Sequence, residues 1–209
     1  MARLDFLKSL ARSAARSASD RLGASDLAEI LRRRLGALSL LQTTLDDAQL
    51  TRAVGRSAGV AAATVQIDSG RLRVQVTDDA GRDTSMTLRP GNVSFAPHGA
   101  KEVSFAVEPP ELADGALAVD IVGAIAAEVA RTLWGPFLAG ARRSSARRHT
   151  HSAFVHRAGA TLTADLRTVP EVRAILSQRL PAALLDALRL EGLQATPGVL
   201  RLQLGLHGL

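Results

Sequence analysis

The fold is decided between Thr64 and Val76, where the chain reads TVQIDSGRLRVQV. Apolar and polar residues alternate on both sides of Asp68-Ser69-Gly70, and this period of two is typical of half-buried β-strands. The Asp, Ser and Gly residues between the two runs indicate a tight turn. The stretch therefore predicts a β-hairpin with one face turned toward the core.

A second stretch near the C-terminus repeats this pattern. Residues 198–204 read GVLRLQL, and residues 70–76 read GRLRVQV. Each is the second arm of a predicted hairpin, and the later hairpin turns at Thr196-Pro197-Gly198. Two interpretations stay open: an internal duplication, or a chance similarity of common residues in similar local structure.

Further short strands are expected between these hairpins. Thr84–Leu88 and Val103–Val107 have strand character and flank a predicted loop that contains Pro90-Gly91. Pro109-Pro110 is expected to stop the second of these strands, because proline cannot donate to a sheet ladder. Another strand is expected over residues 160–166.

Two long apolar helices are expected to pack on this sheet. The first spans about Gly115 to Leu138, where two adjoining apolar rows make a wide core face. The second begins after Thr168-Val169-Pro170-Glu171, which matches a capping box, and is expected to reach about Leu190 with a kink at Pro181. Shorter helical segments are expected over 2–22, 25–41 and 46–54. The predicted fold class is therefore α+β, with an antiparallel curved sheet packed on long apolar helices and an N-terminal helical segment.

Charge divides the chain into segments. The 209 residues carry a formal net charge of +6, and the basic side chains concentrate in residues 1–56 and 142–157, whereas residues 57–141 are acidic on balance. We therefore expect an N-terminal basic helical segment over 1–56 and an α+β domain over 57–209. Its halves, 57–139 and 153–209, are related if the duplication is real, and a basic linker over 140–152 joins them.

Several functions lack support in the sequence. The chain has no Cys, so disulfides, thiolate nucleophiles and Cys-based zinc sites are excluded. No G-x-S-x-G motif and no phosphate-binding glycine loop occurs. No stretch reads as a membrane span or a secretory signal. We therefore expect a non-enzymatic protein without a cofactor, cytoplasmic and peripheral on the membrane if it associates with one.

The basic linker is a candidate anion site. Guanidinium groups bind phosphate well, often through two hydrogen bonds each, and the phosphate could belong to a lipid head group. Nucleic acid is not expected, because base stacking needs aromatic side chains and Phe154 is the only one nearby in sequence. The guanidinium groups belong to Arg142, Arg143, Arg147 and Arg148.

The histidines beside this cluster allow other interpretations. His149 and His151 form an H-x-H pair, and on a strand both imidazoles would face one side and could reach one metal ion, with His156 close behind. The surrounding arginines disfavour a cation, and no acidic ligand is near in sequence. An ordinary solvated loop is the plainer interpretation of the same residues.

The C-terminal part of the chain resembles a known family. The run Leu162-Thr163-Ala164-Asp165-Leu166, the Pro-opened helix, Leu184-Leu185-Asp186-Ala187-Leu188 and Gly198-Val199-Leu200-Arg201-Leu202 together resemble small bacterial proteins of the tubular lipid-binding (TULIP-like) superfamily. The resemblance implies a long helix wrapped by a curved antiparallel sheet, with an acyl chain between them.

Two functional hypotheses follow. The first is non-enzymatic binding of an apolar or amphipathic ligand, above all a lipid, at or near a membrane surface. An apolar interior would hold the chain and the basic linker would hold an anionic head group. The alternative is a structural or interaction protein whose Arg-rich N-terminal helices dock on a protein partner or an anionic membrane. The candidate ligand-binding residues of the first hypothesis are Leu117, Ile121, Ile125, Val129, Ile175 and Leu184 for the interior, and Arg142, Arg143, Arg147 and Arg148 for the head group.

Overall fold

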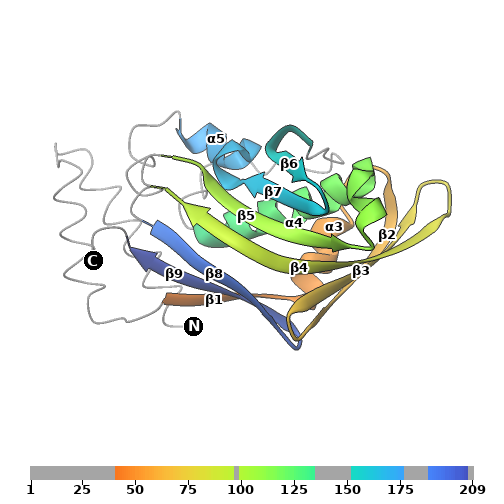
Figure 1. Ribbon diagram of the computed structural model, residues 1–209, viewed down its shortest axis with the longest axis horizontal. Helices are drawn as coiled ribbons and strands as arrows, with labels where there is room; N and C mark the ends of the chain where they lie inside the picture. The colour runs from red at the N-terminus through yellow and green to blue at the C-terminus, as the bar shows by residue number, and fades with distance from the viewer. Residues whose placement is uncertain (1–40, 97–98, 135–151, 177–187, 207–209) are drawn as a thin grey trace.

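The computed structural model describes residues 41–96, 99–134, 152–176 and 188–206. It confirms an α+β fold built from antiparallel sheets, with two sheets and one long helix among the described residues (Figure 1). The helix predicted over 2–22, residues 25–40 of the helix predicted over 25–41, and residues 140–151 of the basic linker lie outside the described residues. Leu41, the expected end of the second of these helices, is the first residue of a strand instead. The predicted boundary at residue 56 stays a prediction.

The strands form two sheets instead of the single sheet expected. The larger sheet has the order β2-β3-β4-β5-β7-β6 and the smaller one the order β1-β9-β8, with antiparallel pairing throughout. The strands are β1 (Leu41–Asp46), β2 (Val60–Asp68), β3 (Arg71–Asp78), β4 (Asp83–Phe95), β5 (Lys101–Glu108), β6 (Val155–Ala158), β7 (Thr161–Asp165), β8 (Leu188–Thr196) and β9 (Val199–Leu206).

The helices depart from the prediction at one important point. The second long helix was expected to reach Leu190, and this end is wrong, because the backbone from Leu188 onward pairs with β9 as a strand. The helix is described as α5 over Pro170–Leu176, and residues 177–187 lie outside the described residues. The Thr168 hydroxyl donates a 2.8 Å hydrogen bond to the carbonyl of Asp165. The described helices are α3 (Asp47–Val54), α4 (Ala116–Trp134) and α5 (Pro170–Leu176), with 3-10 turns η1 (Pro110–Asp114), η2 (Ser152–Phe154) and η3 (Leu166–Thr168).

The hairpin predicted from Thr64 to Val76 is confirmed as β2 and β3. Asp68 pairs with Arg71 across the turn, and Gly70 has a φ of 74°, a conformation that residues with a Cβ rarely adopt. Alternate side chains point inward, and they form rows that continue into β4. Two of these rows are buried, Ile67–Leu72–Leu88 and Val65–Val74–Met86.

The C-terminal hairpin of β8 and β9 matches the β2–β3 hairpin in length and turn. β2 and β8 have 9 residues each, and β3 and β9 have 8 each. The tips meet through two backbone hydrogen bonds, from Gly70 N–H to the Ala195 carbonyl at 3.0 Å and from Gly198 N–H to the Ile67 carbonyl at 2.8 Å. In both bonds the backbone N–H of one turn glycine donates to the carbonyl of the residue three positions before the other turn glycine. The duplication itself stays a prediction.

Strand β4 is longer than expected because it continues through Pro90-Gly91, which we predicted to be a loop. Its pairing with β5 shifts register between Pro90 and Val93, which marks a β-bulge. A bulge tolerates proline, since the local ladder is already interrupted. The Ser104 hydroxyl fills the bulge and donates to the Asn92 carbonyl at 2.8 Å. A Cβ on Gly91 would lie 2.8 Å from Ser104 Oγ, so only glycine fits there without a shift.

Helix α3 caps the free edge of β2. The prediction of a helix from Asp46 is confirmed: Asp46 is the N-cap, and its side chain and that of Gln49 form a capping box. From this helix Thr51 Oγ1 accepts a 2.9 Å hydrogen bond from Val65 N–H, and Asp47 Oδ1 accepts one of 2.9 Å from Ile67 N–H. Side chains therefore satisfy amides of β2 that face away from its ladder with β3.

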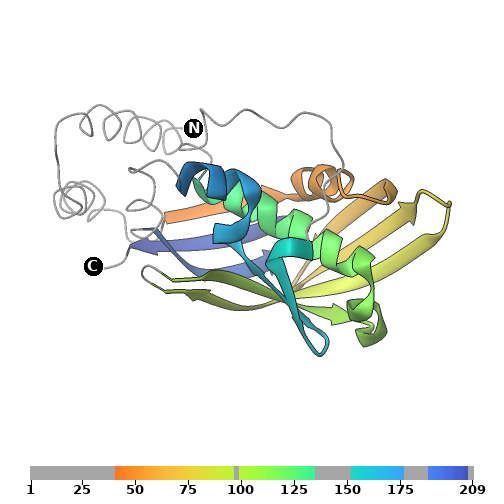
Figure 2. The same cartoon turned by 90° about the horizontal axis from the view of Figure 1, so that it is seen from above.

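Helix α4 supplies the centre of the core. It lies across one face of the sheets when the molecule is seen from above (Figure 2), and it contacts strands of both sheets. Its two predicted apolar rows are buried except at the first turn, where Leu117 is partly exposed. Ile121, Ile125 and Val129 have no exposed surface. One continuous cluster of buried side chains joins α4 to both sheets.

Candidate functional site

The two sheets meet along a line where strands run side by side without a ladder. β3 pairs with β4 only from Asp83 to Leu88, whereas β5 pairs with it on to Phe95. Beyond Leu88 the β3-facing edge of β4 has no ladder partner among the described strands. β8 contacts β4 and runs alongside this part of it (Figure 1). We define the β4–β8 seam as residues 89–95 of β4 and residues 188–196 of β8.

Apolar side chains line the inner side of this seam. Val93 of β4 and Leu193 of β8 are partly exposed, and both pack against the core cluster. Behind them Val103, which pairs with Val93, is completely buried, and so is Leu202, which pairs with Leu193. The seam is therefore a place where the apolar core comes close to solvent between two strands.

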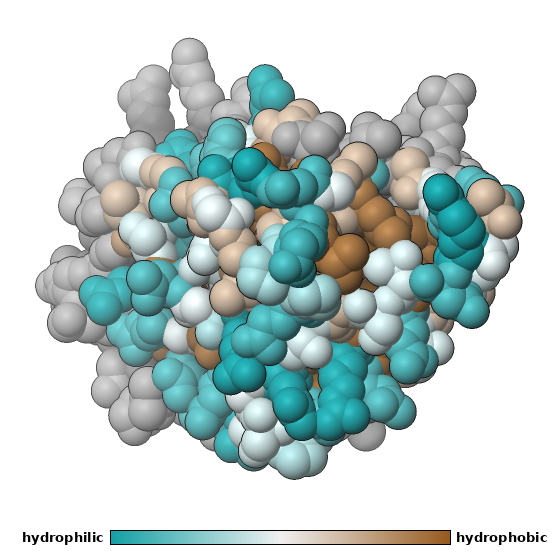
Figure 3. All heavy atoms as spheres, turned by 45° about the vertical axis from the view of Figure 1, so that its right-hand side comes forward, coloured by the Kyte–Doolittle hydropathy of each residue, from teal (hydrophilic) through white to brown (hydrophobic). Residues whose placement is uncertain are grey.

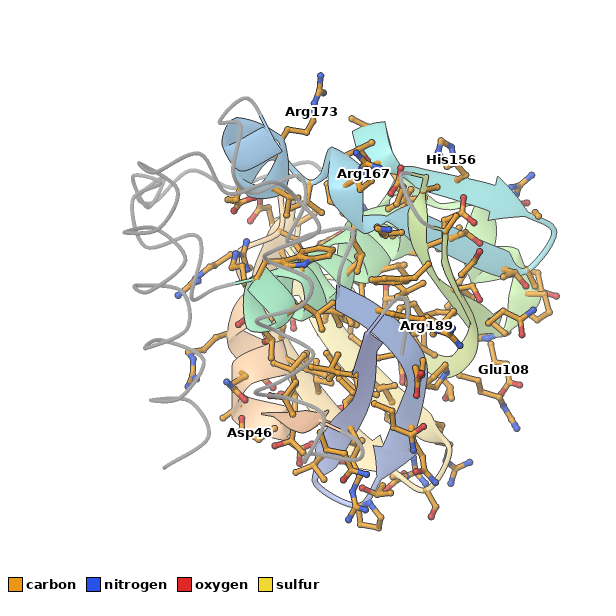
Figure 4. All side chains as sticks on the ribbon, turned by 90° about the vertical axis from the view of Figure 1, so that its left-hand side faces the viewer. Asp46, Glu108, His156, Arg167, Arg173 and Arg189 are labelled. Carbon is orange, nitrogen blue, oxygen red and sulfur yellow. The ribbon has the colours of Figure 1, made fainter. Side chains whose placement is uncertain are left out.

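Ion pairs form a polar rim on the outer side of the seam. Arg89 Nε lies 2.7 Å from a Glu108 carboxylate oxygen, and Arg189 Nε lies 3.7 Å from one of Glu191. Viewed from the end of the molecule, Arg189 lies by β8, on the side toward β4 and β5, with Glu108 farther out (Figure 4). These side chains are about half exposed, so their pairing contributes little stability but keeps both signs of charge at the rim.

An aromatic and cationic cluster closes the end of the seam. Phe95, the last residue of β4, stacks on Trp134, the last residue of α4, with ring centroids 6.3 Å apart. Lys101, directly opposite Phe95 in the ladder, has no exposed surface. Its ammonium lies 5.8 Å from the centre of the Phe95 ring and donates to the carbonyl of Ala96.

A second charged group fixes α5 against α4. Arg131 donates to Glu128 at 2.6 Å and to Glu171 of α5 at 3.1 Å. Burial lowers the pKa of Arg131, but the charges and hydrogen bonds of Glu171 and Glu128 outweigh burial and raise that pKa above its usual value. Arg131 is consequently a permanent cation, and its role is to hold the two helices together.

The opposite end of α4 also brings apolar side chains to the surface. Leu112, Leu117 and Val119 are partly exposed there. The space-filling view from this side of the molecule shows hydrophobic atoms reaching the surface between polar ones (Figure 3). They form small patches, which are normal on a folded protein and need no ligand to explain them.

A trough of about 380 Å³ lies on the sheet nearby. Thr77 and Asp83 in it already bond to each other, with the hydroxyl donating at 2.7 Å, and most of its side chains are exposed. It therefore gives a ligand little shielding from water, and we assign it none. Its lining residues are Ala62, Ala63, Thr64, Gln75, Val76, Thr77, Asp83, Thr84 and Ser85.

The structure brings together only part of the site expected from sequence. Ile121, Ile125 and Val129 lie in the core on α4, and Leu117 lies at its partly exposed start. The backbone of Ile175 belongs to α5. Outside the described residues lie Leu184, Arg142, Arg143, Arg147 and Arg148, together with His149 and His151.

Sequence reasoning missed the residues of the seam and its closed end. Val93 and Phe95 alternate with Ser94, which is a strand signal, but the preceding Pro90-Gly91 favoured a loop. Lys101 carried no signal of burial, because lysine is almost always exposed. Trp134 lies within the first long apolar helix predicted from Gly115 to Leu138, but nothing local connected it with Phe95.

Among the described residues, no cluster of three or more His, Asp or Glu side chains could hold a metal ion. His156 lies in β6 and is exposed. None of the helices within the described ranges combines the length and the apolar character that crossing a membrane requires.

Comparison of the chain with protein-family models, with curated proteins and with solved structures finds no match. The function is therefore inferred from the chemistry of the described residues.

Proposed function

We propose that the protein binds the apolar chain of an amphipathic ligand, a lipid in the broad sense, at the β4–β8 seam. The observation that carries the proposal has two parts. β4 and β8 lie side by side without a hydrogen-bonded ladder between them, and each strand has an apolar side chain on the inner side of this contact, Val93 on β4 and Leu193 on β8. A backbone ladder would hold two such strands together. Here Val93 and Leu193 each pack against the core instead, and an apolar chain can lie between the two strands.

Burial of an alkyl chain would supply the favourable free energy for an occupant of the seam. Each methylene group that an alkyl chain buries contributes about 0.8 kcal/mol, and parting β8 from β4 breaks no ladder hydrogen bonds. The opposing cost is the lost contact between Val93, Leu193 and the core. Because the ligand exchanges one apolar contact for another, the expected affinity is in the micromolar range, well short of what the buried area alone suggests.

The ligand is expected at the seam and not along α4. Ile121, Ile125 and Val129 have no exposed surface, so the space beside them is filled by protein. An acyl chain that reached them would need to displace buried side chains and create compensating cavities, which is costly. We therefore place the proposed ligand between the two sheets, and not against the α4 residues that the sequence suggested.

The alternative function, docking through the Arg-rich N-terminal helices, depends on residues 1–40. These lie outside the described residues, so that hypothesis stays a prediction.

The test uses the full chain, delipidated and mixed with laurate, with binding read by native mass spectrometry. Leu193→Arg places a charge among the apolar side chains of the seam, and Gln194→Arg places the same charge on the neighbouring exposed position of β8. We expect wild type and Gln194→Arg to bind laurate, and Leu193→Arg to lose at least tenfold in affinity. Equal binding by both variants would contradict the seam as the site, and no uptake by the wild type would contradict the function itself.

A further inference from the structure

The strand edges on either side of the seam have no backbone partner within the described part of the chain. Beyond Leu88, β4 pairs only with β5, and β8 pairs only with β9. In an antiparallel ladder, the N–H and C=O groups of one residue point to the same side of the strand, and the side alternates from residue to residue. Outside a bulge, every second residue of each strand therefore points its backbone polar groups into the seam.

Two hydrogen bonds identify the residues of β4 that point into the seam. Ala96 N–H donates to the Ala100 carbonyl at 3.2 Å, so the next residue back, Phe95, points away from β5. Lys101, which lies opposite Phe95, accordingly donates its N–H to a side chain of β7 at 3.1 Å. Because the direction alternates, Val93 also points its N–H and C=O groups away from β5 and into the seam.

One hydrogen bond gives the same information for β8. The Ala195 carbonyl accepts from Gly70 N–H at 3.0 Å, so Ala195 points away from β9. Leu193 lies two residues earlier with no register shift between the two, and it therefore points to the same side. The Ala195 carbonyl is thus occupied, whereas the N–H and C=O groups of Leu193 have no partner among the described strands.

Val93 and Leu193 consequently provide two kinds of surface. Their side chains pack against the core on the inner side of the seam, and their backbone polar groups point into the gap between the strands. Both residues are partly exposed, so a ligand can reach them from solvent. The seam combines an apolar contact with backbone donors and acceptors at strand level.

The free edge of β2 shows how the chain protects a strand edge by itself. There Thr51 and Asp47 of α3 accept hydrogen bonds from two amides of β2. No side chain of the described ranges does the same for the backbone of Val93 or Leu193. A bare alkyl chain in the seam would cover these backbone groups without pairing them, which is unfavourable. A ligand with amide groups at this level would pair them.

We propose that the seam ligand is an N-acylated peptide, whose extended peptide segment lies between β4 and β8 and pairs with the backbone of Val93 and Leu193. The inference rests on the proposed function, because the acyl chain of the same ligand contacts these two side chains on the inner side. Adding a strand to an unpaired sheet edge is a general way to bind an extended peptide. Seating it places β4 and β8 about 10 Å apart, which is two ladder spacings, and breaks no ladder bond.

The experiment compares three ligands that share a lauroyl chain and a single carboxylate: laurate, N-lauroylglycylglycine, and the N-methylated analogue N-lauroylsarcosylsarcosine. Glycine adds no side chain, and N-methylation removes both N–H donors, so the comparison isolates the amides. Native mass spectrometry of the full, delipidated chain gives the affinities. We expect N-lauroylglycylglycine to bind about tenfold tighter than laurate, as about two net hydrogen bonds predict. The N-methylated analogue should bind no tighter than laurate.

Hydrogen exchange, read by NMR, locates the pairing. N-lauroylglycylglycine should slow the exchange of the Val93 and Leu193 amides at least tenfold relative to the laurate complex. Laurate is the control, because it stabilises the fold by binding the same seam without forming backbone hydrogen bonds.

Two variants at one position assign the preference to the strand edge. Val93→Pro keeps an apolar side chain but removes the N–H, and it breaks no bond of the β4–β5 ladder because that N–H points away from β5. Val93→Ala shortens the side chain but keeps the N–H. Val93→Pro should reduce the preference for N-lauroylglycylglycine over laurate to threefold or less. Val93→Ala should weaken both ligands and keep the preference.

The outcomes separate the inference from the proposed function. If N-lauroylglycylglycine binds no tighter than laurate or than its N-methylated analogue, or if neither seam amide gains protection over the laurate complex, the peptide pairing is wrong while the apolar seam stands. If none of the three ligands binds, the proposed function fails as well. If Val93→Pro does not fold, as judged by its thermal melt, the N-methylated analogue and the amide exchange decide.

Discussion

Gly70 and Ala195 are joined by a backbone hydrogen bond between the tips of two hairpins that lie far apart in the sequence. The reverse bond, from Gly198 to Ile67, uses the equivalent positions of the other hairpin. The two turns therefore stabilise each other, and each depends on the left-handed conformation of its glycine. The sheet region beside the β4–β8 seam is anchored at this contact.

Replacing either turn glycine by alanine should destabilise the protein by a similar amount. Gly70 and Gly198 have φ values of 74° and 76°, and a residue with a Cβ pays about 1–2 kcal/mol in this region, although a Cβ would meet no other atom there. Urea unfolding of Gly70→Ala and Gly198→Ala measures the loss. Gly115→Ala is the control, because its φ of −79° is ordinary. A loss below 0.5 kcal/mol at both turns, on the order of the scatter for surface substitutions, contradicts the prediction.

Thr51→Val should leave one backbone amide on the free edge of β2 without a hydrogen-bond acceptor. The substitution keeps the side-chain shape but leaves Val65 N–H without its acceptor, which costs about 1–3 kcal/mol for a buried group. Hydrogen exchange at the Val65 amide should accelerate accordingly. Thr64→Val makes the same chemical change on an exposed position of β2 and should be close to neutral. If the two variants have equal stability, Thr51 does not cap the edge.

Gly91→Ala should distort the bulge of β4, because its Cβ would lie 2.8 Å from Ser104 Oγ. Overpacking of this kind costs about 1–3 kcal/mol. Removing the hydroxyl with Ser104→Ala should relieve the clash, so the double variant should be more stable than the sum of the two single losses predicts. A double-mutant cycle measures this coupling. Strict additivity would mean that the two side chains do not meet.

The turn between β3 and β4 should contribute a pH-dependent stability. Hydrogen bonds from the backbone and side chain of Arg82 lower the pKa of Asp78 below 3.8, against a smaller opposing effect of desolvation. A lowered folded-state pKa means that the contribution is complete above the unfolded value and is lost as pH falls through the folded value. The stability difference between wild type and Asp78→Asn should therefore shrink below about pH 4.

NMR titration of the Asp78 carboxyl group tests the cause of this shift. In Arg82→Gln the Asp78 pKa should move upward toward its ordinary value, because the charged donor is lost while the backbone donors remain. An unchanged titration in this variant would show that the Arg82 side chain has no part in the shift.

The local patterns of the sequence predicted the elements whose partners are close in sequence. The β2–β3 and β8–β9 hairpins, α3 and α4 all follow from periodicity, turn residues and caps that lie within a few positions of one another. Strand β1 was missed because Leu41 and Leu45 are spaced four apart, which also suits a helix. Its strand conformation comes from pairing with β9, a contact that no local pattern contains.

The candidate site was harder to predict for the same reason. The seam exists because β4 extends beyond β3, and this depends on a bulge at a Pro-Gly pair that reads as a loop. Phe95, Lys101 and Trp134 come together only after β4, β5 and α4 have packed. Residue types alone suggested the arginines of the linker, because arginine is the usual anion ligand, and gave no reason to expect a buried lysine.

The pairing of β1 with β9 has a consequence for biosynthesis. The ladder joins Leu41 to Leu204, so the smaller sheet cannot form until nearly all the described chain has been made. Closing so long a loop is slow compared with forming a hairpin, and proteins rich in such distant contacts fold slowly. While a ribosome is still adding the last strands, β1 has no ladder partner, and the apolar side chains under α4 are not yet covered by β8 and β9. A nascent chain in this state offers unpaired strand edges and apolar surface, and it depends on chaperones or on rapid completion to avoid aggregation.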